Sequence, residues 1–193
     1  LTPEEAKHIV GVQANLWTEY TPTYSQVEYM ELPRMAALSE IQWTMPKKKE
    51  YADFLKRLPG LIAVYDINQY NYAKHIFQVK SQYIPDTEAN VLNVVLSTID
   101  NTPVYYTLDG SEPTASSNIY TDTLKIGQSC TLKAITIRPN GSSAVLKEDI
   151  KFNKATMQPI TMQQPINEKY KFEGKRTLID GLAGSRNYRT GRW

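Results

Sequence analysis

The sequence predicts a mixed α and β fold in which one βα unit is followed by an antiparallel β-sandwich. Apolar residues alternate at period two near the N-terminus, recur at helical spacing up to about residue 72, and alternate again over about residues 84–152. The composition changes near residues 78–85, where a domain boundary is expected. Three segments are therefore predicted: residues 1–78, 79–153 and 154–193.

The run His8–Thr18 is predicted to form a strand, in which successive side chains point to opposite faces. The apolar face comprises Val10, Val12, Ala14 and Leu16. The other face becomes polar toward its C-terminal end. A half-exposed strand would turn this second face to water, whereas a parallel α/β barrel would turn it into the barrel interior. The alternation alone leaves both interpretations open.

The helices that follow favour the barrel. Thr23 and Gln26 give a capping-box start for a helix that is expected to run to Trp43. Pro33 removes a backbone donor inside this run, so a kink or a helix boundary is expected there. The buried side of the run is expected to hold Val27, Met30, Ala37, Leu38 and Ile41.

A second helix carries an apolar stripe at i, i+3, i+4 and i+7 and is expected to end at Pro59-Gly60. The stripe comprises Tyr51, Phe54, Leu55 and Leu58. Strand, loop and helix in this order form the terminal βα portion of a (β/α)8 barrel. Because a whole barrel takes roughly 250 residues, this segment needs neighbouring units from elsewhere or a pairing with another chain.

The second segment predicts an immunoglobulin-like antiparallel β-sandwich, since short alternating strands are separated by turn signals. The turns are expected at Asp109-Gly110 and Asn140-Gly141. The inward faces are expected to hold Val104, Tyr106, Leu108, Cys130, Leu132, Ala134, Ala144, Leu146, Ile150 and Phe152. On such a face, Cys130 is expected to be an inert buried thiol.

Composition excludes several classes of function. The formal net charge is only +2, which gives no strong field toward nucleic acid, and no apolar run has the length of a membrane span. Cys130 is the only cysteine, and His8 and His75 are far apart in the sequence, so no metal site and no cofactor are predicted. The first residues lack the basic and apolar layout of a signal peptide.

One ordered set of motifs resembles a known family. The run Gly11–Glu19 (GVQANLWTE) is followed by Val27–Arg34 (VEYMELPR) and then by Ala37, Glu40 and Trp43. Together these motifs resemble the eighth barrel strand of family 20 β-N-acetylhexosaminidases and the helix after it. The resemblance covers about the first seventy residues.

The resemblance implies retaining hydrolysis of terminal β-linked N-acetylglucosamine or N-acetylgalactosamine by a substrate-assisted route, in which the acetamido oxygen of the sugar is the nucleophile. An adjacent Asp-Glu pair on an earlier strand orients that group and supplies the general acid and base. No Asp-Glu dipeptide occurs in this sequence. The segment alone is therefore expected to be inactive, with no catalytic residue of its own.

What the resemblance does carry over is substrate binding. The residue that matches Trp17 walls the pocket around the terminal sugar and its N-acetyl group, and the residue that matches Glu19 accepts hydrogen bonds from the hydroxyls at C4 or C6. An aromatic ring stacks on the C–H face of a pyranose, and a carboxylate accepts charge-assisted hydrogen bonds. Arg34 and Glu40 are interpreted as structural residues.

Two further resemblances concern the rest of the chain. The run Tyr106–Pro113 (YTLDGSEP) resembles the C-terminal domain found after many such barrels, where Asp109 is interpreted as a turn residue. The run Thr177–Ser185, with Trp193, resembles the opening strand of a galactose-binding-like domain. Arg186, Arg189 and Arg192 make the end of the chain basic, but aromatic residues between them are too few for a nucleic-acid site.

The expected partners are N-acetylhexosamine-containing glycans and the rest of the catalytic barrel, with no nucleic acid and no membrane span. The resemblance implies that the parent protein is exported to the periplasm, the cell surface or the medium. The alternative interpretation is a non-catalytic carbohydrate-binding or spacer module of a multidomain glycan-processing protein. A third interpretation is a structural adhesion protein built from β-sandwiches. This interpretation leaves the N-terminal motif unexplained.

Overall fold

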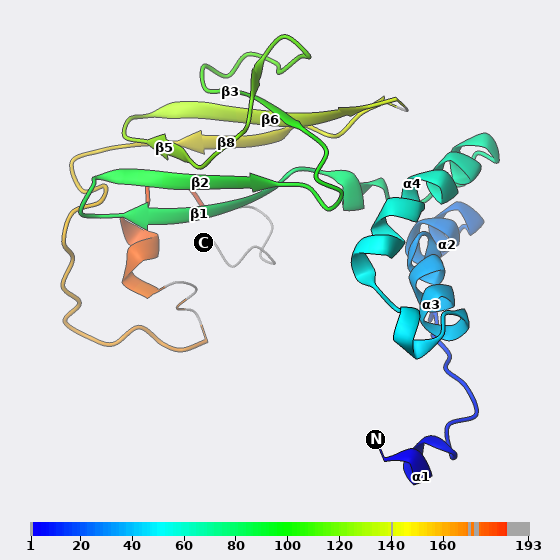
Figure 1. Cartoon of the computed structure of the whole chain (residues 1–193). Coiled ribbons are helices and arrows are strands. Elements are labelled where there is room, and N and C mark those ends of the chain that lie inside the picture. Colours follow the sequence, from blue (N-terminus) through cyan, green and yellow to red (C-terminus); the bar gives the residue numbers. More distant parts are fainter. Residues whose placement is uncertain (1, 140, 170, 172–173, 185–193) are drawn as a thin grey trace. The chain divides into compact units, whose positions relative to one another are not determined.

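The computed structural model describes residues 2–139, 141–169, 171 and 174–184 of the chain. It shows a mixed α and β protein whose sheets are antiparallel. The chain divides into two compact units, Leu1–Ile76 and Phe77–Trp193. Helices build the first unit, and strands dominate the second (Figure 1).

The first unit contains short and medium helices joined by irregular segments. Thr2 and Glu5 form a capping box at the start of the first of them. In chain order they are α1 (Pro3–Ala6), α2 (Tyr24–Glu31), α3 (Arg34–Trp43), the 3-10 turn η1 (Pro46–Lys48), α4 (Tyr51–Ile67) and the 3-10 turn η2 (Lys74–Phe77).

The predicted strand His8–Thr18 is wrong for this chain. Lys7 and His8 end the turn after α1, and residues 9–18 are extended but pair with no strand. Val10 is fully exposed, and half of the Val12 side chain is exposed. An inner barrel strand needs a hydrogen-bonded neighbour on each side, and none of the described residues provides one. The sequence pattern for a barrel strand is present, but its partners are not.

The predicted interruption at Pro33 is confirmed, because α2 ends at Glu31 and α3 begins at Arg34. The predicted start of α2 is also confirmed, since the Thr23 hydroxyl accepts a hydrogen bond from the Gln26 amide at 3.2 Å. The capping box is only half formed, because the Gln26 side chain donates to the Tyr20 carbonyl. The predicted buried side is only partly right. Val27, Ala37 and Leu38 are half-buried, whereas Met30 is 41% exposed and Ile41 is 56% exposed.

The predicted end of the second helix at Pro59-Gly60 is wrong, because α4 continues to Ile67. A proline inside a helix costs about 3 kcal/mol. The apolar stripe continues beyond it, however, and Leu58, Ile62 and Tyr65 are all buried. Burying such side chains contributes roughly 1.5–3 kcal/mol each, which outweighs the cost of the proline.

Tyr65, Tyr70 and Tyr72 pack together near the C-terminal end of the first unit. The Tyr72 hydroxyl donates to Oδ1 of Asp66 at 3.0 Å, and its ring centroid lies 5.8 Å from that of Tyr65. Tyr72 is 3% exposed. Burial, together with the hydrogen bond and charge of Asp66, raises the pKa of Tyr72 to about 12.

Tyr72→Phe is expected to lower the free energy of unfolding of the first unit by about 1 kcal/mol, because the hydrogen bond to Asp66 is lost. Because the pKa of Tyr72 is raised in the folded state, its contribution to the free energy of unfolding is complete below about pH 10, the ordinary pKa of tyrosine. The contribution is lost as the pH rises through about 12. Urea unfolding at pH 8, 10 and 12 measures both effects. An identical pH dependence in the two proteins would contradict the assignment.

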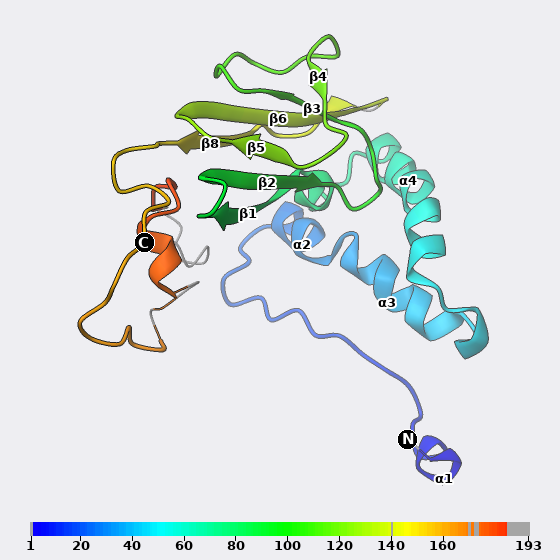
Figure 2. The same ribbon diagram turned by 60° about the vertical axis from the view of Figure 1, so that its left-hand side comes forward.

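The second unit consists of two antiparallel sheets that form two layers (Figures 1 and 2). One sheet has the order β1-β2-β5, and in the other β6 lies between β3 and β8, with β4 paired to β3 and β7 paired to β6. The strands are β1 (Lys80–Asp86), β2 (Val91–Ser97), β3 (Val104–Thr107), β4 (Asn118–Ile119), β5 (Leu124–Ile126), β6 (Cys130–Arg138), β7 (Gly141–Ser142) and β8 (Leu146–Ile150).

Residues from both sheets share one hydrophobic core. Alternate residues of β2 face it, with Leu92 and Val94 fully buried, and Leu132 and Ala134 face it from β6. The inward positions predicted from period-two alternation are confirmed for these β6 residues and for Ile150. Cys130 packs against the core, and burial raises the pKa of its thiol, which favours the unreactive protonated form. Leu108 is 39% exposed and Ala144 is also exposed, so the predicted inward positions of these two residues are wrong.

The chain after β8 packs back onto the second unit. The opening strand expected in the run that starts at Thr177 is not formed in its described residues, because Gly174–Leu178 form the 3-10 helix η3. The Met157 amide donates to the Ile179 carbonyl at 2.8 Å, and the Met157 side chain is 1% exposed in the core. The Lys151 amide donates to the Gly181 carbonyl at 2.8 Å. Gly181 has a φ of +77°, and a Cβ there would lie 3.2 Å from the Lys151 carbonyl oxygen, so this position requires glycine.

Candidate functional site

Trp17 and Glu19 lie in an irregular loop ahead of α2. Both side chains are exposed, that of Trp17 by 75%. They line the same hollow of about 420 Å³, together with Asn15, Leu16 and Thr18. The structure therefore brings the two predicted binding residues to one surface feature.

The loop is fixed at its C-terminal end by local hydrogen bonds. The Thr21 amide donates to the Thr18 carbonyl at 3.0 Å, which closes a turn around Glu19. The cap that Thr23 makes at the start of α2 follows directly. Further back, the Gln42 side-chain amide donates to the Val12 carbonyl at 2.9 Å and ties the extended segment to α3.

The hollow has one wall, because its five lining residues are consecutive in the sequence. An indole face and a carboxylate suit a sugar ring and its hydroxyls. A ligand in this hollow would remain open to water on its other sides, where neither an acid nor a base of the described residues faces it. Glu19 is the one carboxylate among the described residues that line the hollow, so the arrangement can contribute to binding but offers no acid–base pair.

Arg34 and Glu40 have structural contacts, as predicted. The Arg34 guanidinium donates to the carbonyls of Tyr29 and Met30, which satisfies acceptors at the end of α2. Glu40 accepts from Arg57 of α4 at 2.8 Å and from the Thr44 hydroxyl at 2.9 Å. The hydrogen bonds from Arg57 and then Thr44 lower the pKa of Glu40.

An apolar groove between α3 and α4 was not predicted. Its volume is about 490 Å³. Met35 and Trp43 line it and are 49% and 86% exposed, although large apolar side chains are usually covered. Their spacing along α3 is the signal that could have found it, since residues eight apart lie on one helix face. The full lining is Met35, Ala36, Ser39, Glu40, Trp43, Thr44, Phe54, Arg57, Leu58, Leu61 and Tyr65.

A polar hollow on the second unit contains Asp109 and Asp149, but these carboxylates have local partners. Asp109 accepts from the Ser111 amide and hydroxyl, which lower its pKa and form the predicted turn with Gly110 at a φ of +81°. Asp149 accepts from the Thr131 hydroxyl and pairs with Lys147, and both contacts lower its pKa. This hollow carries no assigned role.

The described residues contain neither a cluster of metal ligands nor a membrane-spanning helix. Among these residues, no three His, Cys, Asp or Glu side chains gather as metal ligands would. His75 contacts the Tyr29 hydroxyl at 3.1 Å. No helix in the described part of the chain has the length and apolar character of a membrane span. Ser185, Arg186, Arg189, Arg192, Trp193 and Asn140 lie outside the described residues.

Two family models match the chain. Residues 1–46 match the catalytic domain of glycosyl hydrolase family 20, a range that includes Trp17 and Glu19. Residues 94–150 match the family described as Fn3 associated. The second match begins within β2 and ends with β8.

Three curated relatives carry hexosaminidase names. A beta-hexosaminidase of Porphyromonas gingivalis is 31% identical over 169 residues, which is 86% of this chain and 21% of the relative. A beta-N-acetylhexosaminidase of Cellulomonas fimi is 38% identical over 50 residues, or 26% of this chain and 10% of the relative. A beta-hexosaminidase of Vibrio vulnificus is 50% identical over 42 residues, which is 22% of this chain and 5% of the relative. The chain thus spans about a fifth of the length of the Porphyromonas protein.

Proposed function

We propose that this chain is the C-terminal part of a retaining exo-β-N-acetylhexosaminidase of glycosyl hydrolase family 20. The match of residues 1–46 to the family's catalytic domain and the hexosaminidase names of the relatives support this. The parent enzyme removes terminal β-linked N-acetylglucosamine or N-acetylgalactosamine by substrate-assisted catalysis. One observation carries the proposal: Trp17 and Glu19 line one exposed hollow inside the segment that matches the catalytic domain.

In this proposal the two residues bind and orient the sugar. The indole of Trp17 packs against the terminal ring and its N-acetyl group, which limits the acetamido oxygen to positions from which it can attack C1. The carboxylate of Glu19 accepts hydrogen bonds from the hydroxyl at C4 or C6. The proton donor and the group that orients the acetamide come from an Asp-Glu pair in the upstream part of the protein. Neither role falls to this chain, because its sequence has no Asp-Glu dipeptide.

The same proposal assigns the remaining surface and segments. The rest of the barrel covers the exposed groove between α3 and α4, since one βα unit is a small part of the roughly 250 residues that a barrel takes. Residues 79–153 form an immunoglobulin-like accessory sandwich, supported by the shared core of the two sheets. Residues 154–193 are a linker and the start of a galactose-binding-like domain. We also propose, from the family resemblance alone, that the parent enzyme is exported to the periplasm, the cell surface or the medium.

Glu19→Gln in the full-length protein tests the proposed site. Replacing the carboxylate by a neutral amide weakens the hydrogen bonds from the sugar, so kcat/KM for a nitrophenyl N-acetylglucosaminide should fall about 10- to 100-fold. A substrate that lacks the hydroxyl contacted by Glu19 should show a much smaller loss, because the bond is already absent.

Glu50→Gln is the matched control, since Glu50 is an exposed glutamate outside the hollow. It should leave kcat/KM within about twofold of wild type. Equal losses for Glu19→Gln on the parent and on both the 4-deoxy and the 6-deoxy substrates would show that Glu19 does not contact the C4 or C6 hydroxyl.

A further inference from the structure

The connection between the two units is short and is anchored at each end within its own unit. On the upstream side, Ala73 is 1% exposed and its amide donates to the Leu32 carbonyl at 2.9 Å. On the downstream side, Val79 is 6% exposed and belongs to the core of the second unit. The 3-10 turn η2 (Lys74–Phe77) crosses the boundary at Phe77.

Arg138, at the end of β6, forms a two-pronged ion pair with Asp100. Its Nη2 lies 2.7 Å from Oδ1 of Asp100, and its Nε lies 3.1 Å from Oδ2. The two side chains are only 14% and 15% exposed. A guanidinium in this fork geometry is fixed in direction as well as position, which an ammonium group would not be.

The third nitrogen of this guanidinium reaches Phe77. Nη1 of Arg138 donates to the Phe77 carbonyl at 3.1 Å and to the Thr136 hydroxyl. The guanidinium carbon also lies 5.1 Å from the centre of the Phe77 ring, within the range of a cation–π contact. Arg138 therefore holds the first residue of the second unit through both its backbone and its side chain.

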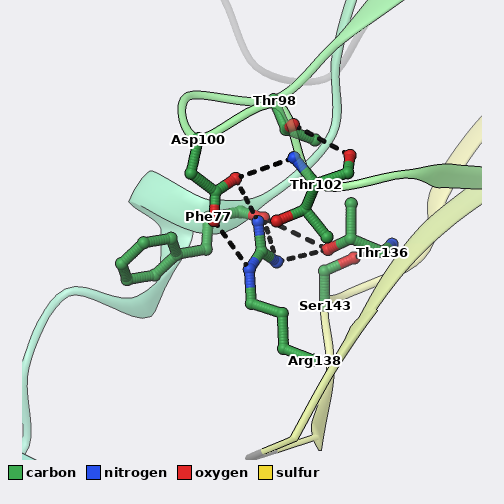
Figure 3. A network of polar contacts seen from close by, with 7 residues as sticks. All are labelled: Phe77, Thr98, Asp100, Thr102, Thr136, Arg138 and Ser143. Carbon is green, nitrogen blue, oxygen red and sulfur yellow. Dashed lines mark hydrogen bonds and ion pairs between the residues drawn. The ribbon is translucent and has the colours of Figure 1, made fainter. Parts of the chain in front are cut away.

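Neighbouring residues hold this network in place (Figure 3). The Thr102 amide donates to Oδ1 of Asp100 at 3.4 Å. Thr136 is completely buried, and its amide donates to the Ser143 hydroxyl at 3.0 Å. Burial would raise the pKa of Asp100, but the hydrogen bonds from Arg138 and Thr102 and the charge of Arg138 lower it overall, so Asp100 stays charged at neutral pH.

We propose that Arg138 and Asp100 form a clamp that fixes the point at which the chain enters the second unit. With Ala73 held on one side and Phe77 on the other, bending of the connection is confined to Lys74, His75 and Ile76. Loss of the clamp extends the bending segment to Phe77 and Gln78, up to Val79 in the core of the second unit. The clamp does not depend on the enzymatic assignment, because every contact in it lies within the second unit.

The test uses the whole chain and two variants, Arg138→Ala and Asp100→Asn. Hydrogen–deuterium exchange of the amides of Phe77 and Gln78 and tryptic cleavage after Lys74 report on the connection. Both rates should rise about tenfold or more in Arg138→Ala, because charge-assisted contacts to Phe77 are lost while strand pairing remains. The amides of β2 and of Cys130–Ala134 should exchange at the wild-type rate.

Asp100→Asn should give a smaller rise at the same residues, because it removes the charge that orients Arg138 but leaves the donor to Phe77. If Arg138→Ala does not fold, the two rates are measured in Asp100→Asn instead. The control is Lys147→Ala, which removes the exposed Lys147–Asp149 ion pair of β8 and should change neither rate. Wild-type exchange at Phe77 and Gln78, together with wild-type cleavage after Lys74, in both variants would overturn the proposal. An equal acceleration over β2 and β6 would also overturn it, since this would indicate general destabilisation.

Discussion

The isolated 193-residue chain is expected to release no measurable nitrophenol from a nitrophenyl N-acetyl-β-glucosaminide. A positioned general acid contributes about 10²- to 10⁴-fold to such reactions, and an enclosed, oriented substrate contributes more. The chain has no Asp-Glu pair, and its hollow has one wall, lined by residues 15–19. Both contributions are therefore missing.

The full-length protein, assayed at the same molar concentration, is the positive control for this experiment. It should hydrolyse the same substrate at an ordinary enzymatic rate. The folded state of the isolated chain is checked by circular dichroism, so that inactivity is not confused with unfolding. Turnover by the isolated chain well above that of a heat-treated sample would refute the proposed division of roles.

Trp17→Ala in the full-length protein is expected to lower kcat/KM by about 100-fold or more. The indole is proposed to restrict the acetamido group that attacks C1, and small errors in such positioning can cost about 10²-fold. The loss should fall mainly on kcat, because a misplaced acetamide still binds but reacts slowly. Trp17→Phe should recover part of the rate, since a smaller aromatic face remains.

Trp43→Ala provides a control of the same residue type. Trp43 is 86% exposed in this chain and lines the groove between α3 and α4, away from the hollow that Trp17 lines. Its removal should lower the melting temperature of the full-length protein, while kcat/KM per folded molecule stays within about twofold. Wild-type kinetics in Trp17→Ala, or equal losses in both tryptophan variants, would count against the proposed site.

Local sequence patterns predicted those parts of the fold that depend on local contacts. Period-two alternation placed Leu132 and Ala134 of β6 in the core, where both are fully buried. The cap at Thr23 and the break at Pro33 also follow from neighbouring residues. Such features need no information about distant segments.

The features that could not be predicted depend on residues far away in the sequence. Whether residues 9–18 form a strand depends on neighbouring strands, so alternation alone overestimated their order. Pro59 is tolerated in α4 because Ile62 and Tyr65 are buried beyond it. Arg138 and Asp100 are 38 positions apart and carry no motif that would pair them.

For the candidate site, the order of motifs identified Trp17 and Glu19, and the structure places both at one hollow. The opposite walls could not be predicted, because no pattern in these residues specifies groups contributed from outside the chain. The same holds for the exposed groove between α3 and α4, whose covering groups also could not be predicted from these residues. An apolar helix face can be recognised from its spacing, but what covers it cannot.

The most direct test is a crystal structure of the full-length protein with a bound N-acetylhexosamine product or inhibitor. The indole of Trp17 is expected within about 4 Å of the terminal sugar or its acetamido methyl group. An oxygen of Glu19 is expected within about 3 Å of the hydroxyl oxygen at C4 or C6. A complex in which the sugar touches neither residue, or in which the two side chains lie on opposite sides of the backbone away from the sugar, would contradict the proposed function.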